Sequence, residues 1–335
     1  MTEAQIKKLV IETEEESIKK PKMLETAVSW IFFSKKYVYK IKKPIKTSFL
    51  DYSSLKKRQY FCQKEFDINS KYSKDVYMGV VEVKDFKNKI VLGLDKGSTV
   101  DYAIKMRRLS NSNLLSEMIA EGKIEAEEVL KLAEKIADVH INSEIVKVEA
   151  DDQTLFQNFR DILSVKEVIV SNFDEQYVKL LEISVEKAQA FLSSMKELIV
   201  KRTEELFFRE CHGDLHTGNI FLYRTPILFD ALEFSDRFRH IDVINDLAFL
   251  CMDLEYHGRQ DLSELIVKEY LKKFKAIRNS EERKLFVYYK MYRANVRAKV
   301  LCLQLASEKT PDDDLKMKIR KYFDLIREYL NLLTE

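Results

Sequence analysis

The spacing of hydrophobic residues changes along the chain, from short β-like runs to helical periods. Between about residues 23 and 94, the runs MLETAVSWIFFS, YVYKI, MGVVEV and KIVLGL are rich in β-branched and aromatic residues, which is typical of strands. Ser34, Lys35 and Lys36 predict a hairpin turn between the first two runs. An amphipathic stretch at about 53–72 predicts one helix among these strands.

From about residue 113 onward the pattern is mainly helical. Amphipathic segments predict helices at about 125–140, 176–204, 242–256, 261–277, 280–304 and 312–334. One strand-like island interrupts them: LFFREC, the loop HGDLHTGN, then IFLY, a turn at 224–226 and ILFD. We therefore expect an α+β protein with a strand-rich first part and a helical second part.

Composition excludes two common nucleotide-binding motifs. The 335 residues include only seven glycines, at positions 79, 93, 97, 122, 213, 218 and 258, so the dinucleotide fingerprint G-x-G-x-x-G cannot occur. Gly213 and Gly218 have the spacing of a P-loop, but Asn219 and Ile220 follow where that loop needs Lys and then Ser or Thr. The Rossmann dinucleotide fingerprint is therefore absent, and a P-loop nucleotidase is excluded.

Charge and cysteine usage indicate which partners the protein binds and in which compartment it occurs. The 57 basic and 55 acidic residues give a net charge of +2 and alternate along the chain, so no dedicated nucleic-acid surface is indicated. The four cysteines include no C-x-x-C pair, which argues for a reducing compartment, and we expect the cytoplasm. No apolar run approaches the roughly 18 residues of a membrane span, and the first residues lack the apolar core of a signal peptide. The oligomeric state is left open.

The loop HGDLHTGN carries the most informative residues. His212, Asp214 and Asn219 match H-x-D-L-x-x-x-N, the spacing of a kinase catalytic loop. Phosphoryl transfer needs a carboxylate beside the attacking hydroxyl and oxygen ligands for Mg²⁺, and Asp214 and Asn219 would supply them. Asp230 follows Asn219 by 11 residues, and a short hairpin would bring both residues to one ion.

Two other interpretations of this loop stay open. Its polar residues could act only as loop caps and turn formers. His212 and His216 are also four residues apart, as in the metal-binding motif H-E-x-x-H. That motif requires a helix, which the two glycines of the loop oppose, and it leaves Asp230 unexplained. We interpret His216 as a hydrogen-bonding loop residue.

A kinase also needs a lysine for the donor's phosphates and a glutamate that holds this lysine. In YVYKIKKP the strand period places Val38, Lys40 and Lys42 on one face, and Lys40 takes the place of the lysine in V-A-I-K. Lys42 is the second candidate, and a solvated lysine on an edge strand is the remaining alternative. Glu65 lies on an otherwise apolar helix face, so it needs a partner, for which Lys40 is the first candidate. A rim glutamate bonded to solvent is the alternative.

These residues occur in kinase order over most of the chain. The sequence resembles the aminoglycoside phosphotransferase and choline kinase superfamily of protein-kinase-like folds. More closely, it resembles the uncharacterised kinase-like domain that many bacterial proteins carry ahead of a P-loop ATPase domain, and the lack of a Walker A motif implies the kinase-like unit alone. The resemblance covers roughly residues 23–300 and is carried by ETAVSW, YKIKKP, FLDYSSLKKRQYFCQKE, YMGVVEV, KMRRL, HGDLHTGNI, the stretch 230–259 and YRANVRAKV.

The resemblance implies a two-lobed fold. An N-lobe at 1–108 would contain a small antiparallel sheet and one helix, and a mostly helical C-lobe at 109–335 would contain the catalytic loop and the acceptor site. It also implies transfer of the γ-phosphoryl group of ATP, assisted by Mg²⁺, to a hydroxyl of a small molecule, with GTP as an alternative donor. A nucleotide-binding regulatory module and, less favoured, a protein kinase are the alternatives.

The resemblance also implies roles for single residues. Asp214 would be the catalytic base, with His212 bracing the loop, and Asn219 and Asp230 would ligate Mg²⁺. The residues implied at the nucleotide are Lys40 and Val38 on the strand, Glu65 orienting Lys40, and Met106, Arg107 and Arg108 in the hinge. Asp246 would hold the catalytic loop through its backbone.

Two departures from the kinase pattern bear on the activity. Asp230 begins DALE instead of D-F-G, and no A-P-E follows, which disfavours a protein kinase. No glycine precedes Gly79, so the loop that would cover the phosphates, near Ser29, cannot be glycine-rich. The identity of the donor is therefore left open.

The acceptor should bind the helical part, where several arginines occur. Arg293 and Arg297 are four residues apart on one helical face, and with Arg237 they are candidates for clamping a phosphate or carboxylate, which would favour an anionic acceptor. Salt bridges from these arginines and Arg239 to nearby carboxylates are the alternative. His140, on the buried face of a predicted helix, is expected to pack in the core.

Overall fold

The computed structural model describes residues 1–13, 16–47, 50–148, 150–307 and 312–334. Two compact units are present: Met1–Glu117 together with Ile227–Asp236, and Met118–Pro226 together with Arg237–Glu335. The segment that contains Asp230 thus belongs to the strand-rich unit, although it follows the HGDLHTGN loop in the sequence. Phe49, the first residue of the segment FLDYSSLKKRQYFCQKE, lies outside the described residues.

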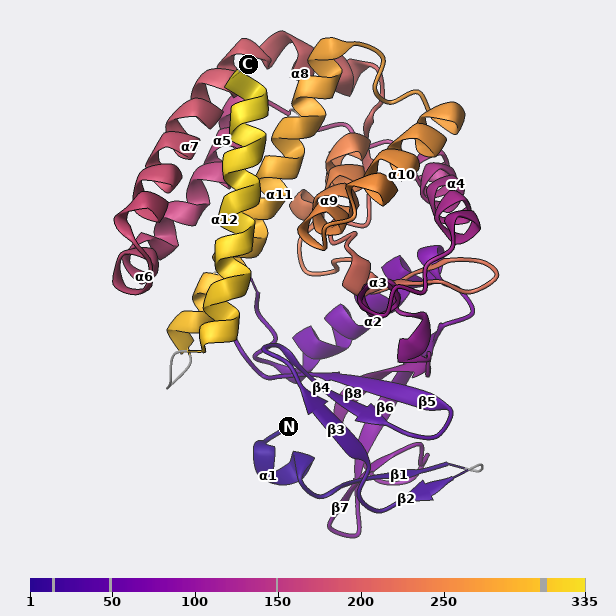
Figure 1. The fold of residues 1–335 in the computed structure, drawn as a ribbon. Coiled ribbons are helices and arrows are strands. Elements are labelled where there is room, and N and C mark those ends of the chain that lie inside the picture. The colour runs from indigo at the N-terminus through magenta and orange to yellow at the C-terminus, as the bar shows by residue number, and fades with distance from the viewer. Residues whose placement is uncertain (14–15, 48–49, 149, 308–311, 335) are drawn as a thin grey trace. The chain divides into compact units, whose positions relative to one another are not determined.

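The first unit is built on a sheet of eight strands among its described residues (Figure 1). The elements before and in this sheet are α1 (Glu3–Ile6), β1 (Leu9–Glu12), β2 (Ser17–Ile18), β3 (Lys22–Glu25), β4 (Ser29–Phe33), β5 (Tyr37–Lys42), β6 (Tyr77–Phe86), β7 (Lys89–Leu92) and β8 (Ser98–Arg107). Their order across the sheet is β2-β1-β7-β6-β8-β5-β4-β3. Neighbouring strands are antiparallel except β1 and β7, which are parallel. The sheet is therefore larger than expected and not purely antiparallel, because β1, β2 and β8 lie outside the predicted runs and β1 pairs parallel with β7.

Alternation along β5 distributes its side chains between two cores. Tyr39 and Ile41 are buried in one cluster, whereas Val38 packs against a second cluster that contains Cys62 and Met106. Successive side chains of a strand point to opposite faces, so the face of Val38 is also the face of Lys40 and Lys42. The strand period in the sequence predicts this division.

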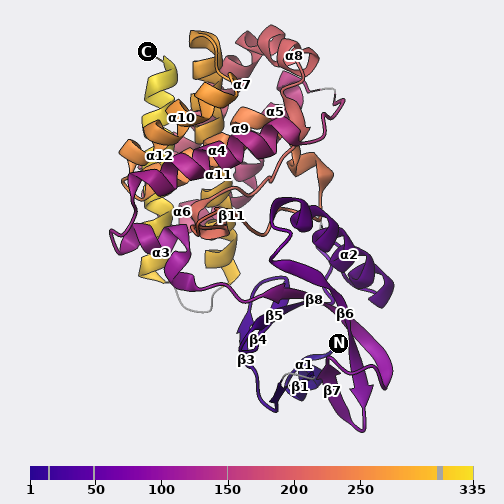
Figure 2. The same cartoon turned by 90° about the vertical axis from the view of Figure 1, so that its right-hand side faces the viewer.

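Helix α2 (Leu55–Tyr72) covers the sheet over β6 and β8 (Figure 2). It begins where Ser54 Oγ accepts a hydrogen bond from the Lys57 N–H, and it ends at Ser73. Glu65 lies on the face of α2 that is turned to the sheet and is fully buried. The predicted helix is therefore present, and its glutamate is not a rim residue.

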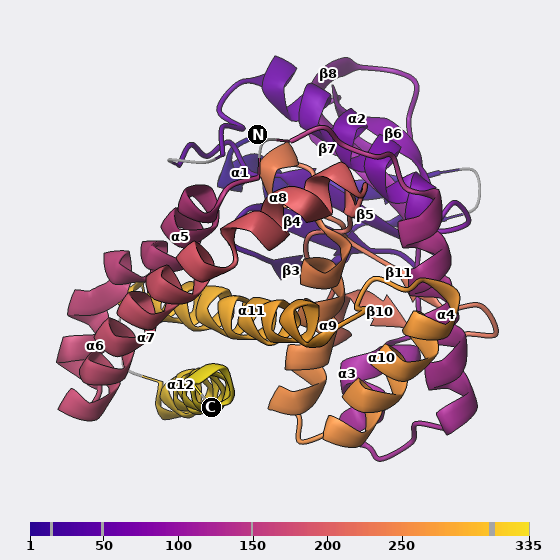
Figure 3. The same ribbon diagram turned by 90° about the horizontal axis from the view of Figure 1, so that it is seen from above.

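The second unit is mostly helical (Figure 3). Its helices are α4 (Ala126–Asn142), α5 (Asp152–Arg160), α6 (Lys166–Asn172), α7 (Glu175–Ser194), α8 (Lys196–Glu204), α9 (Val243–Tyr256), α10 (Gln260–Lys273), α11 (Ser280–Ser307) and α12 (Asp313–Thr334), and α3 (Leu115–Ala120) lies at the unit boundary. The short strands are β9 (Phe208–Glu210), which pairs antiparallel with β12 (His240–Asp242), then β10 (Ile220–Phe221) and, in the first unit, β11 (Ile227–Leu228). The 3-10 turns span Asn111–Asn113, Asp161–Val165, Thr217–Asn219 and Asp236–Phe238. Among the described helices, not one has the long apolar stretch that crossing a membrane requires.

Most helices lie close to where the hydrophobic period predicts them. The segment 176–204 is an exception, because it forms two helices, α7 and α8, that are separated at Met195. Helices α5 and α6 are not expected from the sequence, since nine and seven residues are too few to establish a clear period. Helix α9 is buried on nearly every side because α10 and α11 both pack against it, which agrees with its apolar sequence.

A buried ion cluster fastens α8 to the start of α9 and to α11. Arg202 is fully buried, and its Nε and Nη2 donate to the two oxygens of Asp242 at 2.6 and 2.8 Å. Its Nη1 donates to Glu282 at 3.1 Å. Burial alone would lower the pKa of Arg202, but Asp242 and Glu282 raise it above its ordinary value. Loss of one partner would leave a buried charge unpaired.

Replacing Arg202 with methionine should lower the free energy of unfolding by about 3–5 kcal/mol, because Asp242 would stay in the core without its cation, whereas Glu282 keeps its ion pair with Arg278. Urea unfolding of Arg202→Met measures this change. Lys201→Met, at the exposed neighbouring position on the same helix, is the control and should cost less than about 1 kcal/mol. Equal stability of the two variants would contradict the role assigned to the cluster.

Candidate active site

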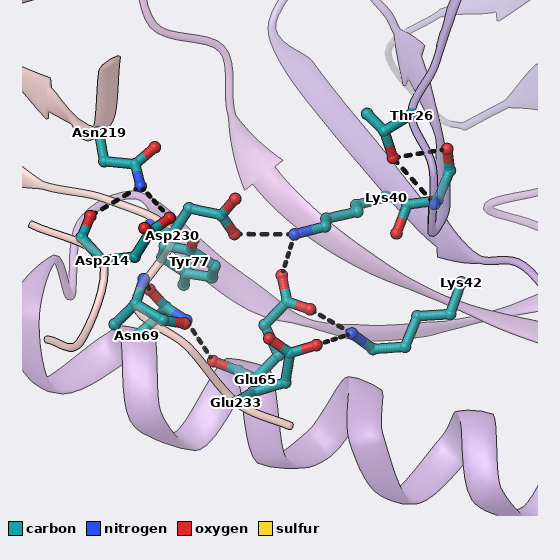
Figure 4. Close-up of polar contacts among 12 residues, drawn as sticks. Thr26, Lys40, Lys42, Glu65, Asn69, Tyr77, Asp214, Asn219, Asp230 and Glu233 are labelled. Carbon is teal, nitrogen blue, oxygen red and sulfur yellow. Dashed lines mark hydrogen bonds and ion pairs between the residues drawn. The ribbon is translucent and has the colours of Figure 1, made fainter. Parts of the chain in front are cut away.

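In the first unit, Lys40 connects two carboxylates (Figure 4). Its Nζ lies 2.8 Å from an oxygen of Glu65 on α2 and 2.7 Å from Oδ1 of Asp230. Burial tends to lower the pKa of Lys40, but the charges of Asp230 and Glu65 raise it well above its ordinary value. The pairing of Lys40 with Glu65 that the sequence predicts is present, and the lysine is charged at neutral pH.

The second lysine of β5, Lys42, is buried more deeply and is also paired. Its Nζ lies 2.5 Å from the other oxygen of Glu65 and 2.5 Å from Oε1 of Glu233. The Tyr52 hydroxyl donates to the same Glu233 oxygen at 2.5 Å. Burial would raise the pKa of Glu233, but the charges of Lys42 and Lys40 lower it to about 2. Glu65 is therefore shared, with one oxygen toward each lysine.

Side chains from α2 and β6 hold the segment that carries Asp230. Asn69 binds the backbone of Ala231 in both directions: its Oδ1 accepts the N–H at 2.7 Å, and its Nδ2 donates to the carbonyl at 3.1 Å. The Tyr77 hydroxyl accepts a hydrogen bond from the Asp230 N–H at 3.2 Å. Asp230 has a φ of 61°, a left-handed conformation that residues other than glycine seldom adopt. Such strain persists where the surroundings enforce it, and it is frequent at functional sites.

In the second unit, Asp246 of α9 holds the HGDLHTGN loop. Its Oδ2 accepts a hydrogen bond from the His212 N–H at 3.1 Å, and its Oδ1 accepts one from the Gly213 N–H at 2.8 Å. Arg293 of α11 donates to the Gly213 carbonyl at 3.0 Å. Gly213 has a φ of 81°, so a larger residue would be strained there. The predicted role of Asp246 in holding the loop backbone is confirmed.

A buried chain of hydrogen bonds lies behind Asp246. His140 of α4 places its Nε2 3.2 Å from Asp246 Oδ2 and its Nδ1 2.8 Å from the hydroxyl of Tyr270. Ligand atoms of His140, Cys211 and Asp246 all lie within 4.8 Å of one another, which a metal ion could exploit. Both imidazole nitrogens and both carboxylate oxygens already have partners, so we interpret the cluster as support for the loop. His140 is a core residue, as predicted.

Asp214 and Asn219 contact each other within the loop (Figure 4). Nδ2 of Asn219 donates to Asp214 Oδ2 and to the Asp214 carbonyl, both at 3.0 Å. His216 Nδ1 accepts a hydrogen bond from the Gly218 N–H, and its Nε2 lies 3.5 Å from Asp214 Oδ2. Burial would raise the pKa of Asp214, but the charges of His216 and Arg297 hold it well below its usual range. Asp214 is therefore ionised at neutral pH.

Asn219 and Asp230 have the donor atoms that Mg²⁺ prefers. Because Nδ2 of Asn219 donates to Asp214, its Oδ1 points away, and no described residue bonds to that oxygen. The Asp230 side chain is 38% exposed, and within the described residues only its Oδ1 is engaged, by Lys40. Hard oxygen donors of this kind suit Mg²⁺. The residues fit the ion, and their joint use stays a prediction.

The predicted hinge is the end of β8 and the residue after it. Met106 is buried in the sheet. The N–H groups of Arg107 and Arg108 donate to the carbonyls of Val76 and Lys36, each at 2.8 Å. These two donors are used within the first unit. Recognition of an adenine by residues 106–108 stays a prediction.

The arginines predicted near the acceptor have different surroundings. Arg237 donates to an asparagine of α5, Arg239 pairs with a glutamate of β9, and Arg293 donates to an asparagine of α9 as well as to the loop backbone. Arg297 makes one hydrogen bond, of 3.4 Å, to the hydroxyl of Tyr322. Their contacts with an acceptor stay predictions.

The sequence pattern does not predict the contacts that Lys42, Tyr52 and Asn69 make in the first unit. Lys42 is a candidate only for the role of Lys40, and neither Tyr52 nor Asn69 is singled out as a site residue. A signal for Glu233 exists, because it follows Asp230 by three residues in an otherwise apolar run. Its partner could not be identified, since 191 residues separate Lys42 from Glu233.

Sequence comparisons find relatives whose function is not described. No family model matches the chain. The chain is 28% identical over 295 residues to uncharacterized proteins of Mycobacterium bovis and Mycobacterium tuberculosis, and the match covers 85% of this chain and 55% of each relative. The chain thus spans about half the length of the curated relatives it matches.

Solved structures with a similar fold are small-molecule kinases. A choline/ethanolamine kinase family protein from Mesorhizobium loti has a TM-score of 0.56 at 14% identity, covering 92% of this chain and 87% of that one. A choline kinase from Cryptosporidium parvum has a TM-score of 0.57 at 12% identity, with 93% and 90% covered. An amicoumacin kinase has a TM-score of 0.53 at 11% identity, with 97% and 92% covered. The chain has the two-lobed, protein-kinase-like α+β fold of these solved structures, and the fold that the sequence predicts is confirmed.

The shared glutamate predicts different contributions of the two lysines to stability. Lys42→Met leaves Glu233 buried without a cation and should lower the free energy of unfolding by about 3 kcal/mol. Lys40→Met leaves Glu65 paired with Lys42 and leaves Asp230 in contact with solvent, so the loss should be about 1 kcal/mol. Urea unfolding of both variants measures the difference. A larger loss for Lys40→Met would show that Lys42 is not the main cation of the network.

The low pKa of Glu233 predicts the effect of acid on the fold. Its pKa of about 2 lies below its ordinary value of 4.5, so ionised Glu233 contributes stability that is fully present above pH 4.5 and is lost as the pH falls toward 2. Glu233→Gln should therefore weaken the decline of the unfolding free energy over this range. Urea unfolding at several pH values measures that decline, and an unchanged slope would contradict the ion pair.

Proposed function

We propose that this chain transfers the γ-phosphoryl group of a nucleoside triphosphate to a hydroxyl group of a small molecule, with Mg²⁺. One observation carries the proposal: Lys40 lies between the buried Glu65 and the partly exposed Asp230. Phosphoryl transfer requires a fixed positive charge for the phosphates beside a carboxylate that binds the metal ion. ATP is the proposed donor, and GTP is the alternative.

In the first unit, Lys40 binds oxygens of the α and β phosphates while Glu65 keeps its orientation. The second pairing of Glu65, with Lys42, keeps a cation beside this buried glutamate while Lys40 engages the nucleotide. Asn219 and Asp230 would hold Mg²⁺, which offsets negative charge on the phosphate oxygens when it is bound. Residues 106–108 are the proposed contact for the base.

In the second unit, Asp214 orients the acceptor hydroxyl. Its low pKa makes it a hydrogen-bond acceptor that stays ionised, and it takes up the hydroxyl proton as the oxygen bonds to phosphorus. His212 and Asp246 act on the position of the loop, and neither needs to touch the substrate. The catalytic carboxylate is thereby held on a rigid support.

The comparisons support this class of reaction. The fold neighbours are named as choline/ethanolamine, choline and amicoumacin kinases, and the last was solved with AMP-PNP and Ca²⁺. A nucleotide and a small-molecule hydroxyl compound are therefore the proposed partners. We propose the cytoplasm as the compartment, because the four cysteines are free and buried.

Two aspartate substitutions should separate binding from transfer. Asp230→Ala should abolish the Mg²⁺-dependent part of ATP affinity, because it removes a ligand of the ion. Asp214→Ala should keep that affinity and lose turnover by a factor of roughly 100 to 10,000. Calorimetry with ATP and Mg²⁺ measures binding, and release of ADP in the presence of pooled hydroxyl metabolites measures turnover.

The control for these variants is Asp236→Ala, which removes a 52% exposed carboxylate from the same segment as Asp230. It should retain nucleotide affinity. Unchanged Mg²⁺-dependent binding in Asp230→Ala, or normal turnover in Asp214→Ala, would contradict the assigned roles.

A further inference from the structure

A cavity of about 330 Å³ opens in the second unit. Its walls come from the start of α5, from the paired strands β9 and β12, and from α9 and α11. Leu155, Phe208 and Ile241 contribute apolar surface, and Thr154 and Arg237 are exposed at its rim. The volume is at the lower end of the range for small-molecule sites, which is roughly 300 to 1,000 Å³. The cavity therefore has room for a small molecule and an opening to solvent.

Two buried side chains on the cavity wall have polar atoms that no described residue satisfies. Asn245 is 3% exposed, and Tyr289 is 1% exposed. Oδ1 of Asn245 accepts a hydrogen bond from Arg293, whereas its Nδ2 and the Tyr289 hydroxyl bond to no residue that the structure describes. Both residues line the cavity, and neither atom is fully enclosed in the interior. Both groups therefore open into the cavity.

The neighbouring tyrosine has the opposite arrangement. Tyr288 is also 1% exposed, and its hydroxyl also lacks a partner among the described residues, but that atom is fully enclosed. Its ring packs against Phe159 and Phe191, with centroids 5.9 and 5.4 Å away, and it does not line the cavity. A buried polar group without a hydrogen bond costs free energy. A ligand in the cavity can remove this cost for Tyr289 and not for Tyr288.

The buried part of the wall offers hydrogen bonds and, among the described residues, no unpaired charge. Both oxygens of Asp242 accept hydrogen bonds from Arg202. At the rim, Arg237 and Asp151 carry opposite charges. His240 adds a half-buried imidazole to which no described residue hydrogen-bonds. An ion that entered the cavity would lose hydration without gaining an opposite charge, so the wall favours an uncharged ligand.

Asn245 also connects the cavity with the HGDLHTGN loop. Arg293 donates from Nε to Asn245 Oδ1 at 2.8 Å and from Nη1 to the Gly213 carbonyl at 3.0 Å. Because a guanidinium can only donate, the amide oxygen must face Arg293, and Nδ2 must face away from it. One guanidinium therefore holds both an amide of the cavity wall and the backbone next to Asp214.

We propose that this cavity binds a small uncharged compound with several hydroxyl groups, a polyol or a monosaccharide. A hydroxyl group both donates and accepts hydrogen bonds, so it matches the amide N–H of Asn245, the phenol of Tyr289 and the imidazole of His240. The carbon atoms of such a compound would contact Leu155 and Phe208. This inference goes beyond the proposed function, because it concerns binding and holds whether or not a phosphoryl group is transferred.

Ligand-detected NMR of the wild-type chain with glycerol, ribose, glucose and myo-inositol tests the proposal. At least one of these uncharged compounds should bind with a dissociation constant of about 1 mM or lower. Glucuronate and glucosamine, the anionic and cationic counterparts of glucose, should bind at least tenfold more weakly than the best uncharged compound, because the wall offers no opposite charge. The measurement needs no nucleotide, so failure of the proposed phosphoryl transfer leaves its result unaffected.

Two substitutions assign the binding to the cavity. Tyr289→Phe removes only the hydroxyl group and should weaken binding roughly three- to tenfold, the contribution of one hydrogen bond. His240→Phe keeps an aromatic ring without its nitrogens and should also weaken binding. Tyr288→Phe is the matched control, because it removes the enclosed hydroxyl of the neighbouring residue, and it should leave the affinity unchanged. Urea unfolding of each variant establishes that it is folded.

Three results would overturn the proposal. The first is that no uncharged compound binds, in which case the cavity holds only water. The second is that a charged counterpart binds more tightly than every uncharged compound. The third is that folded Tyr289→Phe keeps the affinity of the wild type, or loses no more affinity than Tyr288→Phe.

Discussion

The arrangement of the first unit depends on one carboxylate, that of Glu65, which is shared between two lysines of one strand face. A buried glutamate needs a cation, and here Lys40 and Lys42 each contact one of its oxygens. Each lysine also reaches a carboxylate in the segment after β11, Asp230 for the first and Glu233 for the second. The charges that keep Glu65 buried therefore also position the carboxylate proposed to bind Mg²⁺. Stability and the proposed phosphate binding rest on the same network.

In the second unit, side chains from two helices hold the HGDLHTGN loop in position. Its loop residues are held through backbone groups, because Asp246 accepts two N–H bonds and Arg293 donates to a carbonyl. The loop is thereby held without the side chains of Asp214 and Asn219, which contact each other. Arg293 and Arg297 share a face of α11, yet Arg293 donates to the loop backbone and Arg297 donates to the Tyr322 hydroxyl.

Sequence patterns within a single element predict much of the site. They do not predict contacts between segments that are far apart in the sequence. The strand period of β5 and the apolar face of α2 each predict one half of the Lys40–Glu65 pair, because each signal lies within a single element. The HGDLHTGN loop is evident from its spacing alone. The contact of Lys42 with Glu233 depends on how distant segments pack, and so does the parallel pairing of β1 with β7. Which partner each arginine of α11 contacts depends on the surrounding side chains, so no local pattern contains it.

The most direct test of phosphoryl transfer is phosphorus NMR of the chain with ATP, Mg²⁺ and a pooled extract of small metabolites. The account predicts a new phosphoester resonance that grows with time and requires an intact Asp214. ATP that binds the chain and stays unchanged in the presence of the pool would contradict it. That result would favour a nucleotide-binding regulatory module instead.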